Sequence, residues 1–152
     1  MSLDENKAIV RRILDEFWLR DNAQVLDELL ADDCVNYDQS NPEIRGKEAY
    51  KEWANNFRLT TRQGFPDYVV TAEDLIAEGD KVVKRWAFHG THTGEFNGIP
   101  PTGKTVMMRG ATVYHLAGGK VKETYWNSDF LGMLQQLGVI PAPGQQPAGA
   151  SA

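Results

Sequence analysis

The spacing of apolar residues changes once along this chain, close to Tyr68, and that change limits the folds open to it. Before this point apolar residues recur every three to four positions, the period of an amphipathic helix. This period predicts helices over residues 4–20, 22–31 and 47–62. After it they alternate, as in half-buried strands. The alternation predicts strands over residues 67–78, 81–92, 104–117 and 120–128. Helices followed by consecutive strands are typical of an α+β fold, with helices on one side of an antiparallel sheet.

Turn-forming residues mark the boundaries between these elements. The segments Glu78–Lys81 and Ala117–Lys120 predict tight hairpins, and residues 130–137 predict a last short helix. A chain of 152 residues is long enough for one domain with a solid core. We expect that domain over residues 1–140. Residues 141–152 are mostly Pro, Gly, Ala and Gln, which leave little to bury, so we expect a disordered tail.

The connection Gly90–Lys104 lies between two predicted strands and reads GTHTGEFNGIPPTGK. Its four glycines and two prolines cannot continue a strand, because proline lacks a ladder donor and glycine weakens pairing. A long connection with so regular a composition usually serves a site. If the sheet curls, its concave face and the helices would enclose a cone-shaped pocket near this connection.

Charge and apolar pattern argue against several classes of function. The net charge is −5 and Lys and Arg cluster on no segment, which argues against nucleic-acid binding. No apolar stretch approaches membrane-spanning length, and the first residues lack the pattern of a signal peptide. We therefore expect a cytoplasmic protein that contacts no membrane. The one cysteine, Cys34, is expected to be a small buried apolar residue.

Several short motifs occur in an order that identifies a family. They are Gly46–Tyr50, Phe65–Asp67, Glu78–Val83, Gly90–Lys104, Gly119–Glu123 and Asp129–Gly138. In this order they resemble the motifs of the SnoaL-like polyketide cyclases, also called ester cyclases, within the nuclear transport factor 2-like α+β fold. The connection Gly90–Lys104 is the most specific of them.

The resemblance implies a cone-shaped, curved antiparallel sheet wrapped around three N-terminal helices, with the pocket on its concave face. It implies a cofactor-independent, metal-free enzyme that closes a ring in a hydrophobic, carbonyl-rich, polyketide-like small molecule by aldol chemistry. Asp129 matches the family's acid–base carboxylate, and His115 matches a pocket histidine of the adjacent strand. The sequence itself offers no metal-ligand spacing.

Asp129 and His115 each allow a second interpretation. Asp129 stands directly before the predicted helix and could equally cap it. His115 shares a sheet face with Asp129 only if the hairpin register allows it. A two-residue turn at Gly118-Gly119 would put them on opposite faces. A three-residue turn with a bulge would put them on one face and set Arg109 across from Asp129. Otherwise His115 is a partly exposed strand residue.

Further residues are predicted to bind the substrate: Asn36, Tyr37, Trp53, His92, Arg109 and Tyr125. Asn36 would hydrogen-bond a substrate carbonyl, or cap a turn. His92 would hold its own loop, or else contact the substrate. Trp126 alternates with Tyr125 and is predicted on the outer sheet face. Family members dimerise through that face, so a homodimer or homotetramer is expected.

Two other functions remain open on this fold. One is a ligand-binding module without enzymatic activity. The other is an isomerase or an epoxide hydrolase, and the hydrolase chemistry uses an Asp-Arg-Asp set to activate water. The second aspartate of that set would stand two residues after Arg109, where this chain has Ala111, so the resemblance to that class is weaker.

Overall fold

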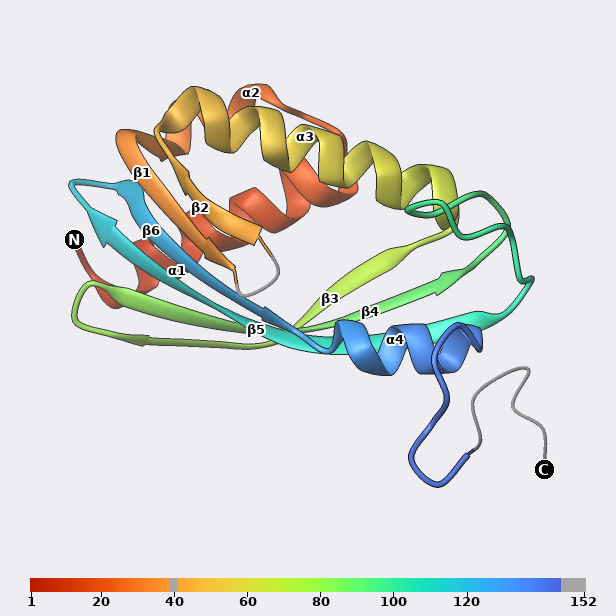
Figure 1. The fold of residues 1–152 in the computed structure, drawn as a ribbon. Coiled ribbons are helices and arrows are strands. Elements are labelled where there is room, and N and C mark those ends of the chain that lie inside the picture. The colour runs from red at the N-terminus through yellow and green to blue at the C-terminus, as the bar shows by residue number, and fades with distance from the viewer. Residues whose placement is uncertain (39–40, 146–152) are drawn as a thin grey trace.

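The computed structural model describes residues 1–38 and 41–145, and it is an α+β fold (Figure 1). In these residues the helices are α1 (Leu3–Arg12), the π-helical segment η1 (Ile13–Leu19), α2 (Gln24–Leu29), α3 (Lys47–Gly64) and α4 (Phe130–Leu137). The strands are β1 (Leu30–Asp38), β2 (Asn41–Arg45), β3 (Val69–Glu78), β4 (Lys81–Thr91), β5 (Thr105–Ala117) and β6 (Lys120–Ser128). The predicted order of helices followed by strands is confirmed.

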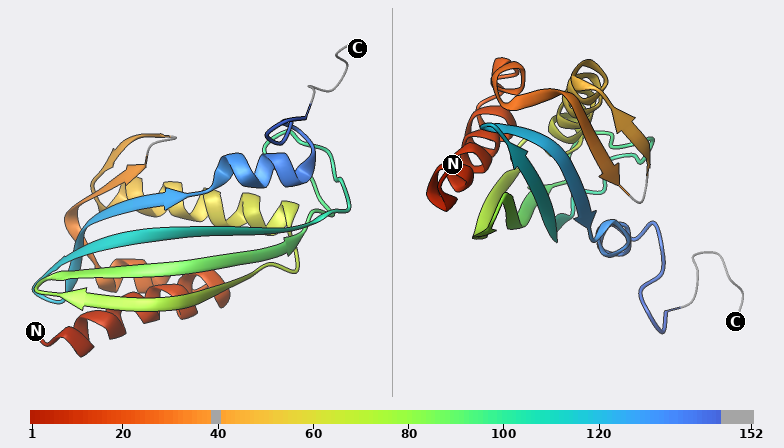
Figure 2. Two further views of the ribbon diagram at one scale, coloured as in Figure 1. Left: turned by 90° about the horizontal axis from the view of Figure 1, so that it is seen from below. Right: turned by 90° about the vertical axis from the view of Figure 1, so that its left-hand side faces the viewer.

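The strands form one curved, open sheet in the order β2-β1-β6-β5-β4-β3. The first three helical elements gather on one face of it, as two further views show (Figure 2). The sheet is mixed, because β1 runs parallel to β6 while the other pairs are antiparallel. The purely antiparallel sheet that we predicted is therefore wrong at this one pair. A parallel pair needs a long crossover, which the chain between β1 and β6 provides.

Strand β2 lies at residues 41–45, where we predicted no strand. It pairs with β1, with Val35 opposite Arg45 and Asn36 opposite Ile44. Pro42 is compatible with this place because β2 is the edge of the sheet, where a missing donor breaks no ladder bond. The predicted tail begins after α4, and residues 141–145 have neither helix nor strand. Residues 146–152, the rest of that tail, lie outside the described residues.

The first helix begins with a capping box at Ser2. The Ser2 hydroxyl accepts a hydrogen bond from the Glu5 backbone N–H at 3.1 Å. In return the Glu5 carboxylate accepts one from the Ser2 backbone N–H at 2.7 Å. In the described part of the chain, no helix is long and apolar enough to cross a membrane.

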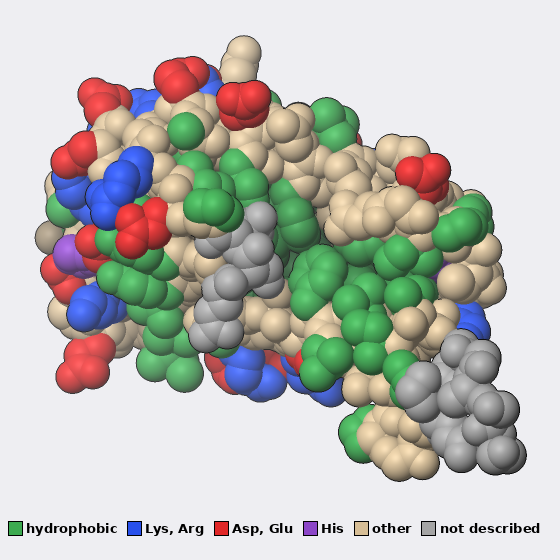
Figure 3. Space-filling model, viewed as in Figure 1, with side chains coloured by type: hydrophobic (Ala, Val, Ile, Leu, Met, Phe, Trp, Pro, Cys, Tyr) green, Lys and Arg blue, Asp and Glu red, His purple; other side chains and the backbone are tan. Residues whose placement is uncertain are grey.

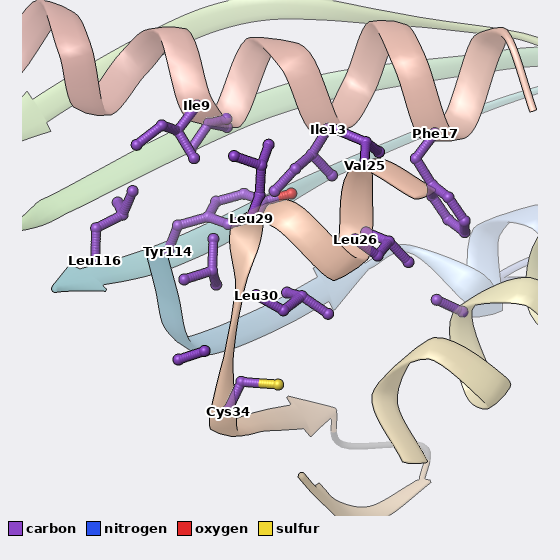
Figure 4. Packing of buried hydrophobic residues seen from close by; sticks show 14 of the residues in the cluster. Ile9, Ile13, Phe17, Val25, Leu26, Leu29, Leu30, Cys34, Tyr114 and Leu116 are labelled. Atoms are coloured by element: carbon purple, nitrogen blue, oxygen red, sulfur yellow. The ribbon is translucent and has the colours of Figure 1, made fainter. Parts of the chain in front are cut away.

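The larger hydrophobic core lies between the first helices and the inner sheet face (Figure 4). Ile9, Ile13 and Phe17 project from α1 and η1 at helical spacing and pack against residues of α2 and β5. Cys34 belongs to this cluster, and burial raises the pKa of its thiol to about 11. This confirms Cys34 as a buried apolar residue. Each large side chain buried here contributes roughly 1.5–3 kcal/mol.

Candidate functional site

A cavity opens between α3 and the inner face of the sheet, beside the larger core. We call it the inner cavity. Its lining consists of Trp18, Asn36, Tyr50, Trp53, Phe57, Thr61, Tyr68, Val70, Lys84, Trp86, Phe88, Met108, Thr112, Tyr114 and Trp126. Most of these side chains are aromatic or aliphatic, so the cavity suits an apolar ligand with few polar groups.

Strand alternation brings the β4 and β5 residues of the cavity together. Lys84, Trp86 and Phe88 occur at every second position of β4, so they share one face. Thr112 pairs with Lys84 on one side and with Trp126 of β6 on the other, which extends this face across three strands. Gly110 leaves the space that the Trp86 ring fills: a Cβ at position 110 would lie 2.3 Å from Trp86 Cζ2.

Trp126 is the centre of the aromatic wall. Its ring lies 4.7 Å from Phe57, 5.3 Å from Trp53 and 6.5 Å from Trp86, measured between ring centroids. Our prediction of Trp126 on the outer sheet face is therefore wrong. Trp53, predicted in the pocket, does line it.

A bulge in β6 explains the reversed orientation of Trp126. The Gly118-Gly119 turn has two residues, with Ala117 opposite Lys120. The register then shifts by one residue, because Leu116 pairs with Val121 but His115 pairs with Glu123. The bulge therefore lies at Lys122. A one-residue shift exchanges the two faces of the strand beyond it, so Trp126 turns inward and Tyr125 outward.

Lys84 is the one charged side chain among the described residues lining the inner cavity. It is only 4% exposed, and burial lowers the pKa of its amine to about 8, because the charged form is poorly solvated there. Arg11 lowers this pKa further and Asp15 opposes the shift. Lys84 Nζ lies 5.5 Å from the centroid of the Tyr114 ring. In residues 1–38 and 41–145, no ion pair or hydrogen bond of this amine is found.

Asn36, predicted to bind a substrate carbonyl, also lines the inner cavity and is 1% exposed. Its Oδ1 accepts a hydrogen bond from the Thr124 hydroxyl at 2.6 Å. Its Nδ2 is buried and has no partner among the described residues. An unpaired buried donor costs free energy unless a ligand or water accepts from it. Rotating the amide would exchange the unpaired atom but would still leave one.

Two other polar groups of the cavity are already paired. The Trp86 indole N–H donates to the Thr112 hydroxyl at 3.1 Å. The Tyr68 hydroxyl donates to the backbone carbonyl of Trp18 at 2.5 Å. Lys84 and Asn36 differ from these residues, because each brings into the cavity a donor that has no partner in the described part of the chain.

A wider groove adjoins the inner cavity and shares Trp53, Phe57 and Trp126 with it. We call it the outer groove. It is lined by Asp38, Trp53, Asn56, Phe57, Thr60, Phe96, Asn97, Trp126, Ser128, Phe130 and Leu134. Apolar side chains gather in the hollow between α3 and α4 (Figure 3). The volume open to the centre of a water molecule is about 70 Å³ in the inner cavity and about 530 Å³ in the groove. The inner cavity is therefore narrow, and a larger ligand would have to extend into the groove.

Asp129 lies at the edge of the outer groove, between the groove residues Ser128 and Phe130. Its carboxylate accepts a hydrogen bond from the Gly132 backbone N–H at 2.9 Å, so Asp129 caps α4. The side chain is exposed, and Asp129 is not among the residues lining either hollow. Its backbone N–H donates to the carbonyl of Arg109 at 3.1 Å, so these two residues do lie across from each other.

His115 and Arg109 lie on the outer sheet face, away from the inner cavity. His115 Nε2 is 2.7 Å from Asp80 Oδ2, and His115 Nδ1 is 3.3 Å from Glu123 Oε2. The hydrogen bond from His115 lowers the pKa of the Asp80 carboxyl. His115 lies near the hairpin end of β5, opposite Glu123 of β6, whereas Asp129 follows the far end of β6, so the structure does not bring them together. Arg109 Nε is 3.5 Å from Glu73 Oε1.

Tyr37 and Tyr125 stack on each other, with ring centroids 4.7 Å apart. Tyr125 is 41% exposed and belongs to the outward face beyond the bulge. Both residues border a small separate hollow with Asp38, Glu43, Trp126 and Asn127. Their predicted contact with a substrate stays a prediction, as does that of Arg109.

His92 holds the connection Gly90–Lys104 together. Its backbone carbonyl accepts from Gly103 N–H at 2.8 Å, and its Nδ1 accepts from Thr102 N–H at 3.2 Å. The ring is fully buried and stacks on Phe65 at 5.2 Å. These are the contacts of a residue that orders its own loop. The connection packs back onto the end of α3, because Gly64 O accepts from Thr93 and Gly94.

Among the described residues no group of three His, Cys, Asp or Glu side chains is placed to hold a metal ion. Sequence reasoning found Asn36 and Trp53 in the cavity but missed Lys84. The available signal was its position on strand 81–92, two residues before Trp86 and two after Val82, where alternation turns a lysine inward.

Solved structures of similar fold come from several bacteria. A candidate SnoaL-like polyketide cyclase of Jannaschia sp. CCS1 is 28% identical, with 91% of this chain and 94% of that chain covered and a TM-score of 0.78. AclR of Streptomyces galilaeus, a candidate hydroxylase, is 26% identical, with 95% and 87% covered and a TM-score of 0.78. IdmH of Streptomyces antibioticus, a candidate polyketide cyclase, is 30% identical, with 88% and 98% covered and a TM-score of 0.73.

Among proteins with curated descriptions, none matches the chain. The family model of the SnoaL-like polyketide cyclases matches residues 8–137, which include every helix and strand that borders the two hollows. The motifs, the curved sheet with its helices and the family model agree, and the chain belongs to the SnoaL-like polyketide cyclase family.

Proposed function

We propose that this protein is a cyclase that closes a ring in a hydrophobic, carbonyl-rich small molecule. The observation that carries the proposal is the narrow aromatic cavity with isolated hydrogen-bond donors, continuous with a wider apolar groove. Aromatic walls favour a flat, conjugated ligand. The unpaired Asn36 donor would fix the position of a carbonyl oxygen.

Aldol ring closure requires two proton transfers. A base removes a proton from a carbon that lies between two carbonyl groups. The resulting enolate carbon attacks a second carbonyl, whose oxygen then receives a proton. A donor such as Asn36 Nδ2 stabilises the negative charge that develops on the oxygen. A carboxylate such as Asp129 can take the first proton and return it in the second step.

The role of Asp129 rests on the family resemblance and on its place at the groove edge. Because its neighbours Ser128 and Phe130 line the groove, a ligand that fills the groove would come closer to its carboxylate than a ligand in the inner cavity. A ligand confined to the inner cavity would not meet it. The proposal therefore requires a substrate that extends through both hollows.

An Asp129→Asn variant tests this role. Asparagine caps helices about as well as aspartate, so α4 should keep its cap and the melting temperature should stay within a few degrees of wild type. With linear β-polyketone esters as substrates, we expect the rate of ring formation to fall by about 10²–10⁴-fold. Asp67→Asn, at an exposed carboxylate bonded to Thr91, is the matched control and should keep its rate.

Wild-type turnover by the Asp129→Asn variant would remove Asp129 from the mechanism. If the wild-type protein binds the esters but converts none of them, the protein is a ligand-binding module instead. Quenching of tryptophan fluorescence measures that binding independently, because Trp18, Trp53, Trp86 and Trp126 all line the inner cavity.

A further inference from the structure

The amino group of Lys84 is a chemically unusual feature of the inner cavity. The side chain is 4% exposed, among aromatic and aliphatic neighbours, and no ion pair is found for it within the described residues. A buried, unpaired ammonium group is costly in an apolar site, where an aliphatic side chain would pack at no such cost. The position therefore makes the neutral amine, which is a nucleophile, more populated than in an exposed lysine.

The groups around Lys84 support this state. Burial is the largest cause that lowers the pKa of its amine, and Arg11 of α1 acts in the same direction. Asp15 of η1 opposes them. The aromatic residues Tyr50, Tyr68 and Tyr114 of the same cavity carry neutral hydroxyls, because burial raises their pKa values.

We propose that Lys84 is the nucleophile of a carbonyl-capture site, which binds a ketone or aldehyde in the inner cavity covalently as an imine. The geometry that supports this is the inward position of Lys84 on β4, in one narrow cavity with the unpaired donor of Asn36. Asn36 on β1 and Lys84 on β4 line the cavity with two strands between them, so Asn36 Nδ2 would hold one carbonyl oxygen of the ligand while the amine attacks another carbonyl carbon.

The step is a condensation with loss of water. The lone pair of Lys84 Nζ forms a C–N bond to the carbonyl carbon, and the C=O π electrons move to oxygen. That oxygen takes a proton from the nitrogen, which gives a carbinolamine. The hydroxyl group then leaves with a second proton as water, and a C=N bond remains. No oxidant, reductant or metal takes part.

The inference rests on the proposed function only for the class of ligand. Once it takes up a proton from solvent, the imine becomes an iminium ion, which withdraws electrons from the adjacent carbon and makes its proton easier to remove, and this would assist ring closure. β-Diketones, the units of a polyketide-like chain, are therefore the ligands that this site should capture best. Imine formation itself does not require a ring to close.

Acetylacetone, a small β-diketone that suits a narrow cavity, is the probe. Its lysine adduct rearranges to a conjugated enaminone that absorbs in the near ultraviolet. At pH 7.5 an amine of pKa about 8 is neutral on the order of a hundred times more often than an exposed lysine. We expect intact mass to show one adduct per chain and peptide mapping to locate it at Lys84. This adduct should form at least tenfold faster than an adduct at any other lysine.

Matched variants separate this site from surface labelling. Lys84→Met and Lys84→Arg should lose the rapid adduct, whereas Lys81→Met, at an exposed lysine of the same strand, should keep it. The melting temperature of each variant checks that the cavity is folded. No rapid adduct in wild type, an adduct spread over surface lysines, or unchanged labelling of folded Lys84→Met would overturn the inference.

The same experiment keeps the two proposals apart. A specific Lys84 adduct without ring closure of any β-polyketone ester supports the carbonyl-capture site and contradicts the cyclase. Ring closure by wild-type protein that forms no Lys84 adduct contradicts the carbonyl-capture site and supports the cyclase.

Discussion

Two polar residues, Lys84 and Asn36, give an otherwise apolar cavity its chemical character. Asn36 is held by the Thr124 hydroxyl at one amide atom and leaves the other unpaired. Among the described residues, Lys84 is held by packing and by the Tyr114 ring alone. Neither arrangement improves the stability of the empty protein, since unpaired buried donors and buried charges both cost free energy. Such a cost is common where a protein is shaped for a ligand.

The burial of Lys84 predicts a pH-dependent effect on stability. The amine has a pKa of about 8 in the folded protein and about 10.4 when unfolded. Below pH 8 both states are charged and the folded state bears the full cost of burial. Between pH 8 and pH 10.4 the folded amine is already neutral, so the cost disappears as pH rises. Lys84→Met should therefore be more stable than wild type at pH 7, with a difference that shrinks by about 3 kcal/mol towards pH 10.5.

Urea unfolding of both proteins at a series of pH values measures this difference. Subtracting the wild-type free energy of unfolding from that of the variant at each pH cancels the titration of the other residues. Lys81→Met is the control, because Lys81 is exposed and its replacement should change stability equally at every pH. A difference between Lys84→Met and wild type that stays constant from pH 7 to pH 10.5 would show that Lys84 is not buried in solution.

At the scale of the elements, the sequence predicts most of the fold. The helices and the strands β3–β6 begin and end within two residues of where we predicted, if the N-terminal helix is taken to continue into η1. The signals that located them are the switch of period near Tyr68, the two hairpin turns and the glycine after α4. Strand β2 and the parallel pairing of β1 were missed. Their pairing depends on distant segments, and local spacing carries no information about it.

The sequence could not decide which side chains of β6 point to the inner face of the sheet and which point to the outer face. Gly118-Gly119 is compatible with more than one register, and the bulge at Lys122 has no sequence signature of its own. In the structure Lys122 reaches β1, where its amine bonds the Asp33 carboxylate at 2.5 and 2.7 Å. This one inserted residue reverses Tyr125 and Trp126, which is why Trp126, predicted on the outer face, lines the inner cavity.

Gly110 of β5 offers a test of the cavity wall. A Cβ there would lie 2.3 Å from Trp86 Cζ2 and 2.5 Å from the backbone oxygen of Asn127. Gly110→Ala should therefore destabilise the protein by about 1–3 kcal/mol, as overpacking does, and should displace the Trp86 ring into the cavity. Thermal unfolding measures the first effect and tryptophan fluorescence the second.

A second substitution separates the two clashes of Gly110→Ala. Adding Trp86→Phe removes the ring atoms that meet the new methyl group but leaves the contact with Asn127 O. The double variant should therefore lose less stability than the sum of the two single variants. Full additivity would show that Gly110 and Trp86 are not in contact.

At the scale of the whole molecule, the curved sheet separates two different surfaces. Its inner face, with α3 and η1, forms the aromatic cavity. Its outer face carries ion pairs such as Arg85 with Asp74 at 2.7 Å and Arg109 with Glu73. The predicted homodimer or homotetramer through this outer face stays a prediction. The catalytic roles of Asp129 and His115 also stay predictions, and only Asp129 lies near either hollow.

We propose that the inner cavity and the outer groove together bind a flat, carbonyl-bearing ligand, and a crystal structure of the protein with a two-ring aromatic hydroxyketone tests this proposal. We expect the carbonyl end in the inner cavity, with its oxygen within about 3.2 Å of Asn36 Nδ2, and the rings against Trp126 reaching the groove. A ligand found only on the outer sheet face, with the inner cavity empty at saturating concentration, would contradict it.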